Sequence, residues 1–171
     1  MKIVDVKAYP TSFRVPPERQ VSLGIGTMTK RDCVMVKVTT EDGIVGWGES
    51  HHARSPGSIG HLINTTLKGF VVGMDATDTV GIWARIYKFQ LGSHGMGAGC
   101  AMAMSGIDMA LWDIKGKATG WPLYKLLGGT RRPVPLVTTA GRRDGYHPPD
   151  AREGPQRRGA WHDRLGRRSE R

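Results

Sequence analysis

Residues 33–49 read CVMVKVTTEDGIVGWGE, and this stretch decides the fold. Valines occupy every second position from Val34 to Val38, which is the period of a β-strand with one buried face. Thr40-Glu41-Asp42-Gly43 then forms a turn, because glycine supplies the positive φ that a tight turn needs. The stretch therefore predicts two antiparallel strands, Cys33–Thr39 and Ile44–Glu49.

A third strand is expected nearer the N-terminus. Ile3–Tyr9 alternates apolar and polar side chains, and Pro10 is expected to end it. Thr11–Lys30 follows without any period and contains two prolines and two glycines. Irregular segments of this length are uncommon inside compact domains and are usually functional or disordered. We therefore expect a three-stranded meander with a long, mobile loop over Thr11–Lys30.

Downstream, apolar residues recur at helical spacing in three segments. These helices are expected at about Ser58–Val72, after an N-cap at Asp75 or Thr77, and at about Ala98–Ala118. The expected buried stripes are Val80, Trp83, Tyr87 and Leu91 on the second helix and Met104, Ile107, Leu111, Ile114 and Ala118 on the third. Leu123–Leu127 adds a short helical turn. Strands followed by segregated helices indicate an α+β fold: a three-stranded antiparallel meander followed by a three-helix bundle, with a disordered C-terminal tail.

Composition divides the 171 residues into a domain and a tail. We expect the domain to span residues 1–130, followed by the start of another strand at Pro133–Thr138, within residues 131–139. Residues 141–171 hold nine Arg, no Lys and five acids, and they carry no apolar period. Such a segment cannot bury enough surface to offset its ordering entropy, so residues 140–171 are expected to be disordered.

The same composition excludes several classes of partner. The net charge is +10, but the basic tail has only Tyr146 and Trp161 as aromatic residues, so we expect no nucleic-acid partner. No apolar run approaches a membrane span or a signal peptide, so we expect no membrane partner and a cytoplasmic location. Cys33 and Cys100 lack metal-type spacing and are expected to be reduced thiols.

Three motifs resemble one family. Val45-Gly46-Trp47-Gly48-Glu49 resembles the "G-x-G-E" strand of mandelate racemase and muconate lactonizing enzymes, in the enolase superfamily. Residues 105–117 resemble that family's "A-x-D-x-A-L-W-D-x-x-G-K" helix, and residues 120–129 its "G-x-P-L-x-x-L-L-G-G" segment. The motifs occur in the family's order and cover roughly residues 1–138. These residues therefore resemble the N-terminal capping domain of that family.

The resemblance implies that two domains of the enzyme have different roles. A capping domain closes over a (β/α) barrel, which carries magnesium on carboxylates and the bases that remove a proton next to a carboxylate. Here no lysine follows Lys125, so the family's "K-x-K" base motif has no counterpart. We therefore expect a chain truncated before the barrel, with no catalytic residue, metal ligand or cofactor of its own and magnesium in the intact family member. The tail is either the product of a shifted reading frame or a natural divergent end.

The resemblance also implies substrate-contacting residues. His51, His52 and Arg54 lie on the loop after the third strand, which faces the active site in the family. The segment from Arg14 to Thr27 corresponds to a mobile lid. The alternatives are a solvated polar loop and an ordinary flexible connection. Neighbouring histidines point in different directions, and Asp108 and Asp113 lie too far around their helix to converge, so neither pair predicts a metal site.

Two functions from different classes remain. The first is a capping-domain fragment, inactive alone, whose parent acts on a small hydroxy acid: dehydration of an acid sugar first, racemisation or cycloisomerisation second. The second is a stand-alone binding protein built on a capping domain. We expect self-association through the barrel-facing surface near Trp112, Trp121, Leu123 and Leu127.

Overall fold

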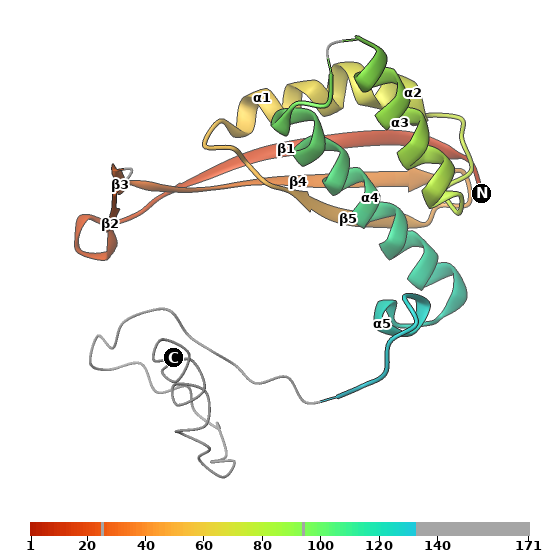
Figure 1. The fold of residues 1–171 in the computed structure, drawn as a ribbon. Coiled ribbons are helices and arrows are strands. Elements are labelled where there is room, and N and C mark those ends of the chain that lie inside the picture. Colours follow the sequence, from red (N-terminus) through yellow and green to blue (C-terminus); the bar gives the residue numbers. More distant parts are fainter. Residues whose placement is uncertain (25, 94, 133–171) are drawn as a thin grey trace, which may run out of the picture. The chain divides into compact units, whose positions relative to one another are not determined.

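A three-stranded antiparallel sheet forms the base of the domain. The computed structural model describes residues 1–24, 26–93 and 95–132, and its first compact unit is Met1–Arg131. The strands are β1 (Ile3–Arg14), β4 (Lys30–Thr40) and β5 (Val45–Ser50), in the order β1-β4-β5 (Figure 1). Gly43 has φ 80° in the turn between β4 and β5. The predicted meander is confirmed.

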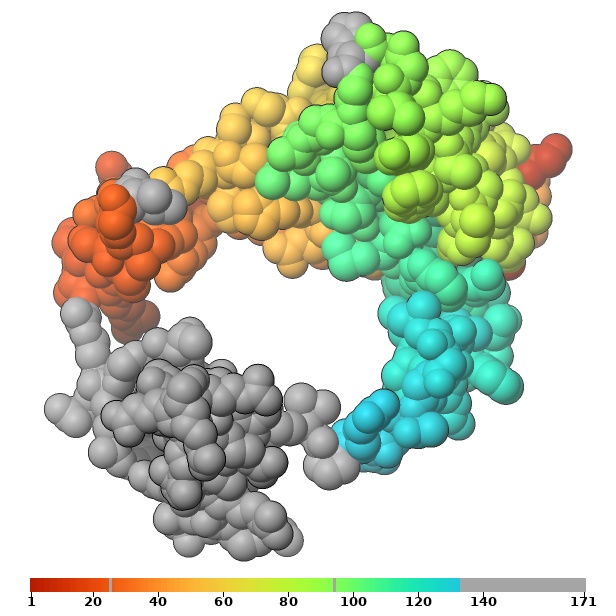
Figure 2. All heavy atoms as spheres, viewed as in Figure 1, coloured from red at the N-terminus to blue at the C-terminus, as the bar shows by residue number. Residues whose placement is uncertain are grey.

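The segment expected to be an irregular loop is largely ordered into β-structure. β1 continues through Pro10 to Arg14, which pairs with Lys30, and the far end holds η1 (Pro17–Arg19) and a small hairpin of β2 (Val21–Leu23) and β3 (Gly26–Met28). Pro10 does not end the strand because β1 is an edge strand, where a missing N–H costs no ladder hydrogen bond. The two long strands form a ribbon whose tip projects beyond the helices (Figures 1 and 2).

All the helices except the last short one cover one face of this sheet (Figure 1). Residues 56–71 form one continuous helical segment, of which the middle part has π-helical hydrogen bonding. The elements are α1 (Pro56–His61), η2 (Leu62–Leu67), α2 (Lys68–Val71), α3 (Thr79–Ser93), α4 (Ala98–Thr119) and α5 (Leu123–Leu126). The α+β class predicted from the sequence is confirmed.

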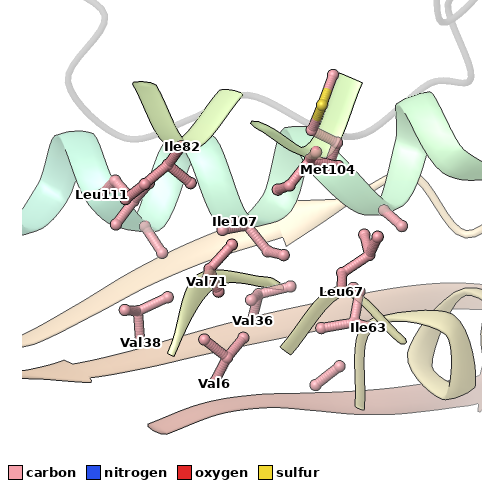
Figure 3. Packing of buried hydrophobic residues seen from close by; sticks show 14 of the residues in the cluster. Val6, Val36, Val38, Ile63, Leu67, Val71, Ile82, Met104, Ile107 and Leu111 are labelled. Carbon is pink, nitrogen blue, oxygen red and sulfur yellow. The ribbon is translucent and has the colours of Figure 1, made fainter. Parts of the chain in front are cut away.

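The core lies between the sheet and the helices. Figure 3 shows Val6, Val36 and Val38 pointing from the strands toward Ile107 and Leu111 of α4. Met104, Ile107, Leu111 and Ile114 are buried as predicted, but Ala118 is exposed because α4 extends past the end of the sheet. On α3 the predicted stripe is wrong: Val80 is 76% exposed and Leu91 53%, whereas Ile82 and Ile86 are buried.

Small residues allow α4 to lie directly on β5. A Cβ added to Gly48 would overlap the carbonyl oxygen of Gly106, and one added to Gly46 would overlap that of Ala110. A Cβ on Gly106 would in turn collide with the Ser50 hydroxyl. The glycines of the "G-x-G-E" strand are therefore required by this close helix–strand contact.

One helical side chain binds the backbone at each edge of the sheet. On β1, the Ala8 N–H donates to Asn64 Oδ1 at 2.7 Å and Asn64 Nδ2 donates to the Ala8 carbonyl at 3.1 Å. On β5, the Trp47 N–H donates to Asp113 Oδ2 at 2.8 Å. Both contacts satisfy backbone groups that an exposed edge would offer to another chain.

Several smaller expectations are corrected or fall outside the described residues. Asp78 caps α3, since its Oδ1 accepts from the Gly81 N–H at 2.8 Å, whereas Asp75 organises the preceding turn through Thr77. No helix within the described ranges is long and apolar enough to cross a membrane. The expected strand Pro133–Thr138 and the expected disorder of residues 140–171 lie outside the described residues.

Candidate functional site

A pocket lies where the β1/β4 ribbon meets the loop after β5. It has a volume of about 140 Å³ and is lined by residues 27–30 together with Asp32, His52 and Arg54. Three of the predicted site residues, Thr27, His52 and Arg54, therefore come together. The ribbon contributes one wall and the loop after β5 contributes the other.

The loop after β5 holds its histidines through its own backbone. Ala53 and Arg54 have positive φ values of 48° and 59°, which non-glycine residues rarely adopt. The Ala53 N–H donates to His51 Nδ1 at 3.1 Å and the Arg54 N–H donates to His52 Nδ1 at 2.9 Å. Strained backbone of this kind clusters at functional sites. Each Nδ1 acts as an acceptor, so in each ring Nε2 carries the proton and is the nitrogen that can donate to a ligand.

The wall formed by β4 contains a buried carboxylate. The Asp32 side chain is 3% exposed; its Oδ1 accepts from the Ser12 hydroxyl at 2.5 Å and its Oδ2 accepts from Lys30 Nζ at 3.0 Å. These contacts, the Ser12 hydrogen bond first, hold the pKa of Asp32 below its ordinary value. His52 Nδ1 lies 3.9 Å from Asp32 Oδ2, beyond hydrogen-bond distance, and it already accepts from the Arg54 N–H. Asp32 is thus ionised and held by Ser12 and Lys30.

The other two predicted residues do not line the pocket. His51 is exposed and stacks on His52, with ring centroids 4.7 Å apart, so the expectation that these two side chains point in different directions is wrong. Arg14 is exposed at the end of β1, opposite Lys30 in the register. His51 therefore helps to hold the His52 ring in place. Arg14 contributes a positive charge where β1 ends, next to the tip of the ribbon.

Sequence reasoning missed three members of this site: Ser12, Lys30 and Asp32. The signal that would have found them is the register of β1 and β4. Lys30 and Asp32 are two apart on one strand and so share a face, and Ser12 pairs directly with Asp32. Because Pro10 is expected to end the first strand, the sequence alone does not reveal this pairing.

The described residues offer no site for a divalent metal. No three His, Cys, Asp or Glu side chains in ranges 1–24, 26–93 and 95–132 could hold an ion together. Asp113 is engaged by the Trp47 N–H and by Lys117 Nζ at 2.6 Å, while burial raises the pKa of Asp108. Asp113 thus has a structural role at the edge of β5.

Comparison with known proteins identifies the family. The profile of the mandelate racemase / muconate lactonizing enzyme N-terminal domain matches residues 8–128. The chain belongs to this family. The matched range contains the ribbon, the loop after β5 and α4, so the pocket is part of the shared domain.

Curated relatives and solved structures of this family are similar to the chain. A D-galactonate dehydratase of Xanthomonas axonopodis is 44% identical over 102 residues, which are 58% of this chain and 25% of the relative. A D-mannonate dehydratase of Caulobacter vibrioides is 39% identical over 71% of this chain and 29% of its own length. An enolase-superfamily protein from Polaromonas sp. JS666 has a TM-score of 0.73 and 53% identity, over 77% of this chain and 34% of that one.

A further solved structure contains a metal ion. It is a mandelate racemase/muconate lactonizing protein from Paracoccus denitrificans complexed with magnesium, with a TM-score of 0.58 and 30% identity over 77% of this chain and 31% of that one. Magnesium is therefore bound by at least this one relative of the chain. This chain spans about a quarter to a third of the length of the relatives named here.

Proposed function

We propose that this domain serves as the capping domain of a magnesium-dependent dehydratase or racemase that acts on a hydroxy acid, with dehydration of an acid sugar as the first choice. The observation that carries the proposal is the pocket in which Thr27, His52 and Arg54 converge within the family domain. The dehydratases of galactonate and mannonate among the relatives support the choice of reaction.

The proposed role of the domain is to bind the end of the substrate remote from the reacting carbon. Arg54 presents a guanidinium suited to bidentate hydrogen bonding with a carboxylate, and His52 presents an Nε2–H donor. Such remote contacts hold the substrate in place while the proton next to its carboxylate is removed. Magnesium stabilises the negative charge that develops in that reaction. The described residues do not themselves fit a magnesium site.

A domain exchange tests this function. Residues 8–128 of this chain replace the matching part of the Xanthomonas axonopodis D-galactonate dehydratase, and turnover is measured over a panel of sugar acids. We expect turnover of at least one acid. We expect Arg54→Asn to raise KM with a smaller effect on kcat, since it removes a binding contact. Asn readily adopts the positive φ at this position, so the loop conformation is preserved.

The 171-residue chain provides the complementary measurement. We propose that it catalyses no such reaction alone and binds no magnesium tightly, because its described carboxylates do not converge. Turnover by the purified chain, or a stoichiometric magnesium site by calorimetry, would contradict this. A folded exchange protein that turns over no acid would contradict the proposed function itself.

A further inference from the structure

The charges that line the pocket do not cancel. Asp32 is the one acid among the lining residues, and Ser12 and Lys30 occupy its two oxygens. Lys30 and Arg54 are both cations of the pocket, so one positive charge remains after Asp32 is matched with Lys30. The ordinary partner for such an excess is an anion.

The groups with unused capacity in the pocket are donors. The Arg54 guanidinium makes no hydrogen bond or ion pair with any other described residue, although its backbone N–H is bound to His52. His52 accepts at Nδ1 and so donates at Nε2. Thr27 shares a hydrogen bond with Ser22, at 2.9 Å between the hydroxyl oxygens. A ligand group that accepts hydrogen bonds and carries negative charge satisfies these donors better than a hydroxyl, which also needs an acceptor.

The size of the pocket restricts the anion. A volume of about 140 Å³ accommodates a group as large as a carboxylate with its neighbouring carbon, but it is well below the several hundred Å³ typical of a site for a whole small molecule. The pocket is therefore suited to one end of a longer ligand. The remainder of that ligand extends outside it.

We propose that this pocket binds a second carboxylate of the substrate, so that the substrate class is a dicarboxylic sugar acid (an aldarate) rather than a monocarboxylic one (an aldonate). The inference rests on the function proposed above, since it specifies the substrate of that same site. Arg54 and the His52 Nε2–H contact the distal carboxylate. Asp32 is a positioning residue, which fixes Lys30 at the pocket wall.

The first experiment uses the full 171-residue chain. Its amide resonances are followed by NMR during titration with galactarate, galactonate and galactitol, of which only the first two carry a carboxylate. We expect galactarate and galactonate to shift the resonances of residues around His52 and Arg54, and galactitol to leave them unchanged. Arg54→Asn should weaken the acid response about tenfold or more, as for the loss of a charge-assisted hydrogen bond. Arg85→Gln, on exposed α3, is the matched control and should have no effect.

The second experiment separates diacids from monoacids. In the exchange protein, kcat/KM is compared within pairs of aldarate and aldonate of the galacto, gluco and manno configurations. We expect the diacid to be preferred within the best pair, and Arg54→Asn to reduce that preference about tenfold or more. Asp32→Asn should reduce it less, and through KM rather than kcat.

The outcomes distinguish the two proposals. Equal responses to galactitol and galactarate, or no response to either acid, would overturn the carboxylate pocket. A preference for aldonates that Arg54→Asn leaves unchanged would overturn the substrate class while the proposed function stands. An exchange protein inactive on every acid would count against the proposed function, and the titration of the full chain would still decide whether the pocket binds carboxylates.

Discussion

Gly48 has no space for a side chain. Its Cβ would overlap the carbonyl oxygen of Gly106 and lie 2.8 Å from the backbone nitrogen of Ala110, and neither backbone atom can move without displacing α4. We expect Gly48→Ala to lower the free energy of unfolding by about 2 kcal/mol or more, as overpacking in a core does. Gly57→Ala is the control, because nothing lies within 4 Å of a Cβ there. Urea unfolding measures both, and equal stabilities would show that β5 and α4 are less tightly packed.

Asp32 links stability to pH at the candidate site. Because its folded pKa lies below the ordinary value of 3.8, the ionised carboxylate stabilises the fold above that value. This stabilisation is lost as the pH falls from the ordinary value through the lowered folded one. Ser12→Ala should therefore destabilise the protein at pH 7 by more than it does under strongly acidic conditions. Urea midpoints across that range test the sign; a difference that grows on acidification would contradict it.

At the scale of elements, α3 shows where hydrophobic periodicity is ambiguous. The helix carries two apolar stripes: Val80, Trp83, Tyr87 and Leu91 on one side, and Ile82 and Ile86 on the other. The larger aromatic stripe is predicted to be buried, but Ile82 and Ile86 are the α3 residues that join the buried core with Ile107 and Leu111 of α4. The aromatic stripe remains outside, where Trp83 and Tyr87 stack with ring centroids 5.0 Å apart.

This reversal can be tested with two truncations of similar size. Ile86 is fully buried, so Ile86→Ala should lower the free energy of unfolding by about 2–5 kcal/mol. Val80 is 76% exposed, so Val80→Ala should change it by less than about 0.5 kcal/mol. Thermal and urea unfolding measure both variants. A larger loss in Val80→Ala than in Ile86→Ala would restore the stripe expected from the sequence.

The β1/β4 ribbon shows a second limit of sequence reasoning. The strands near the core were predictable because Val34, Val36 and Val38 alternate with half-buried residues. Beyond Pro10 the ribbon leaves the core, and Phe13 is 66% exposed. Without a buried face there is no alternation to detect. Part of the candidate site lies on this stretch. The resemblance to the family points to His52 and Arg54, whereas Lys30 and Asp32 follow only from the register of β1 and β4.

For the whole molecule, two of the three motifs that suggest the family also supply contacts that assemble the domain. Gly46 and Gly48 admit α4 to the sheet, and Asp113 of α4 closes the edge of β5 at Trp47. In the third motif, residues 120–129, the chain turns after α4 through Gly120, with φ 66°, into α5. Figure 2 shows this last described part projecting past the end of α4. Its side chains therefore contribute little to the core.

The exposed side chains of this projection lead to a prediction about association. Trp121 is 57% exposed, Leu123 40% and Leu127 65%, on the face that we expect to meet the barrel. Contiguous apolar patches on soluble proteins usually mark interaction sites. We therefore expect the 171-residue chain to self-associate and to bind a hydrophobic dye despite its net charge of +10. Sedimentation velocity over a concentration series measures the association.

Two variants locate the association on the molecule. Combining Trp121→Lys with Leu127→Lys should shift the chain toward monomer and reduce dye binding, because charged side chains cannot be desolvated in an apolar contact. Trp83→Lys is the control on α3, whose aromatic residue is also exposed, at 44%. If Trp83→Lys shifts the chain to monomer and the double variant does not, the surface of α3 mediates the association. The prediction is wrong if the unsubstituted chain stays monomeric at every concentration and binds no dye. In that case neither surface mediates association, and the apolar residues after α4 pack locally instead.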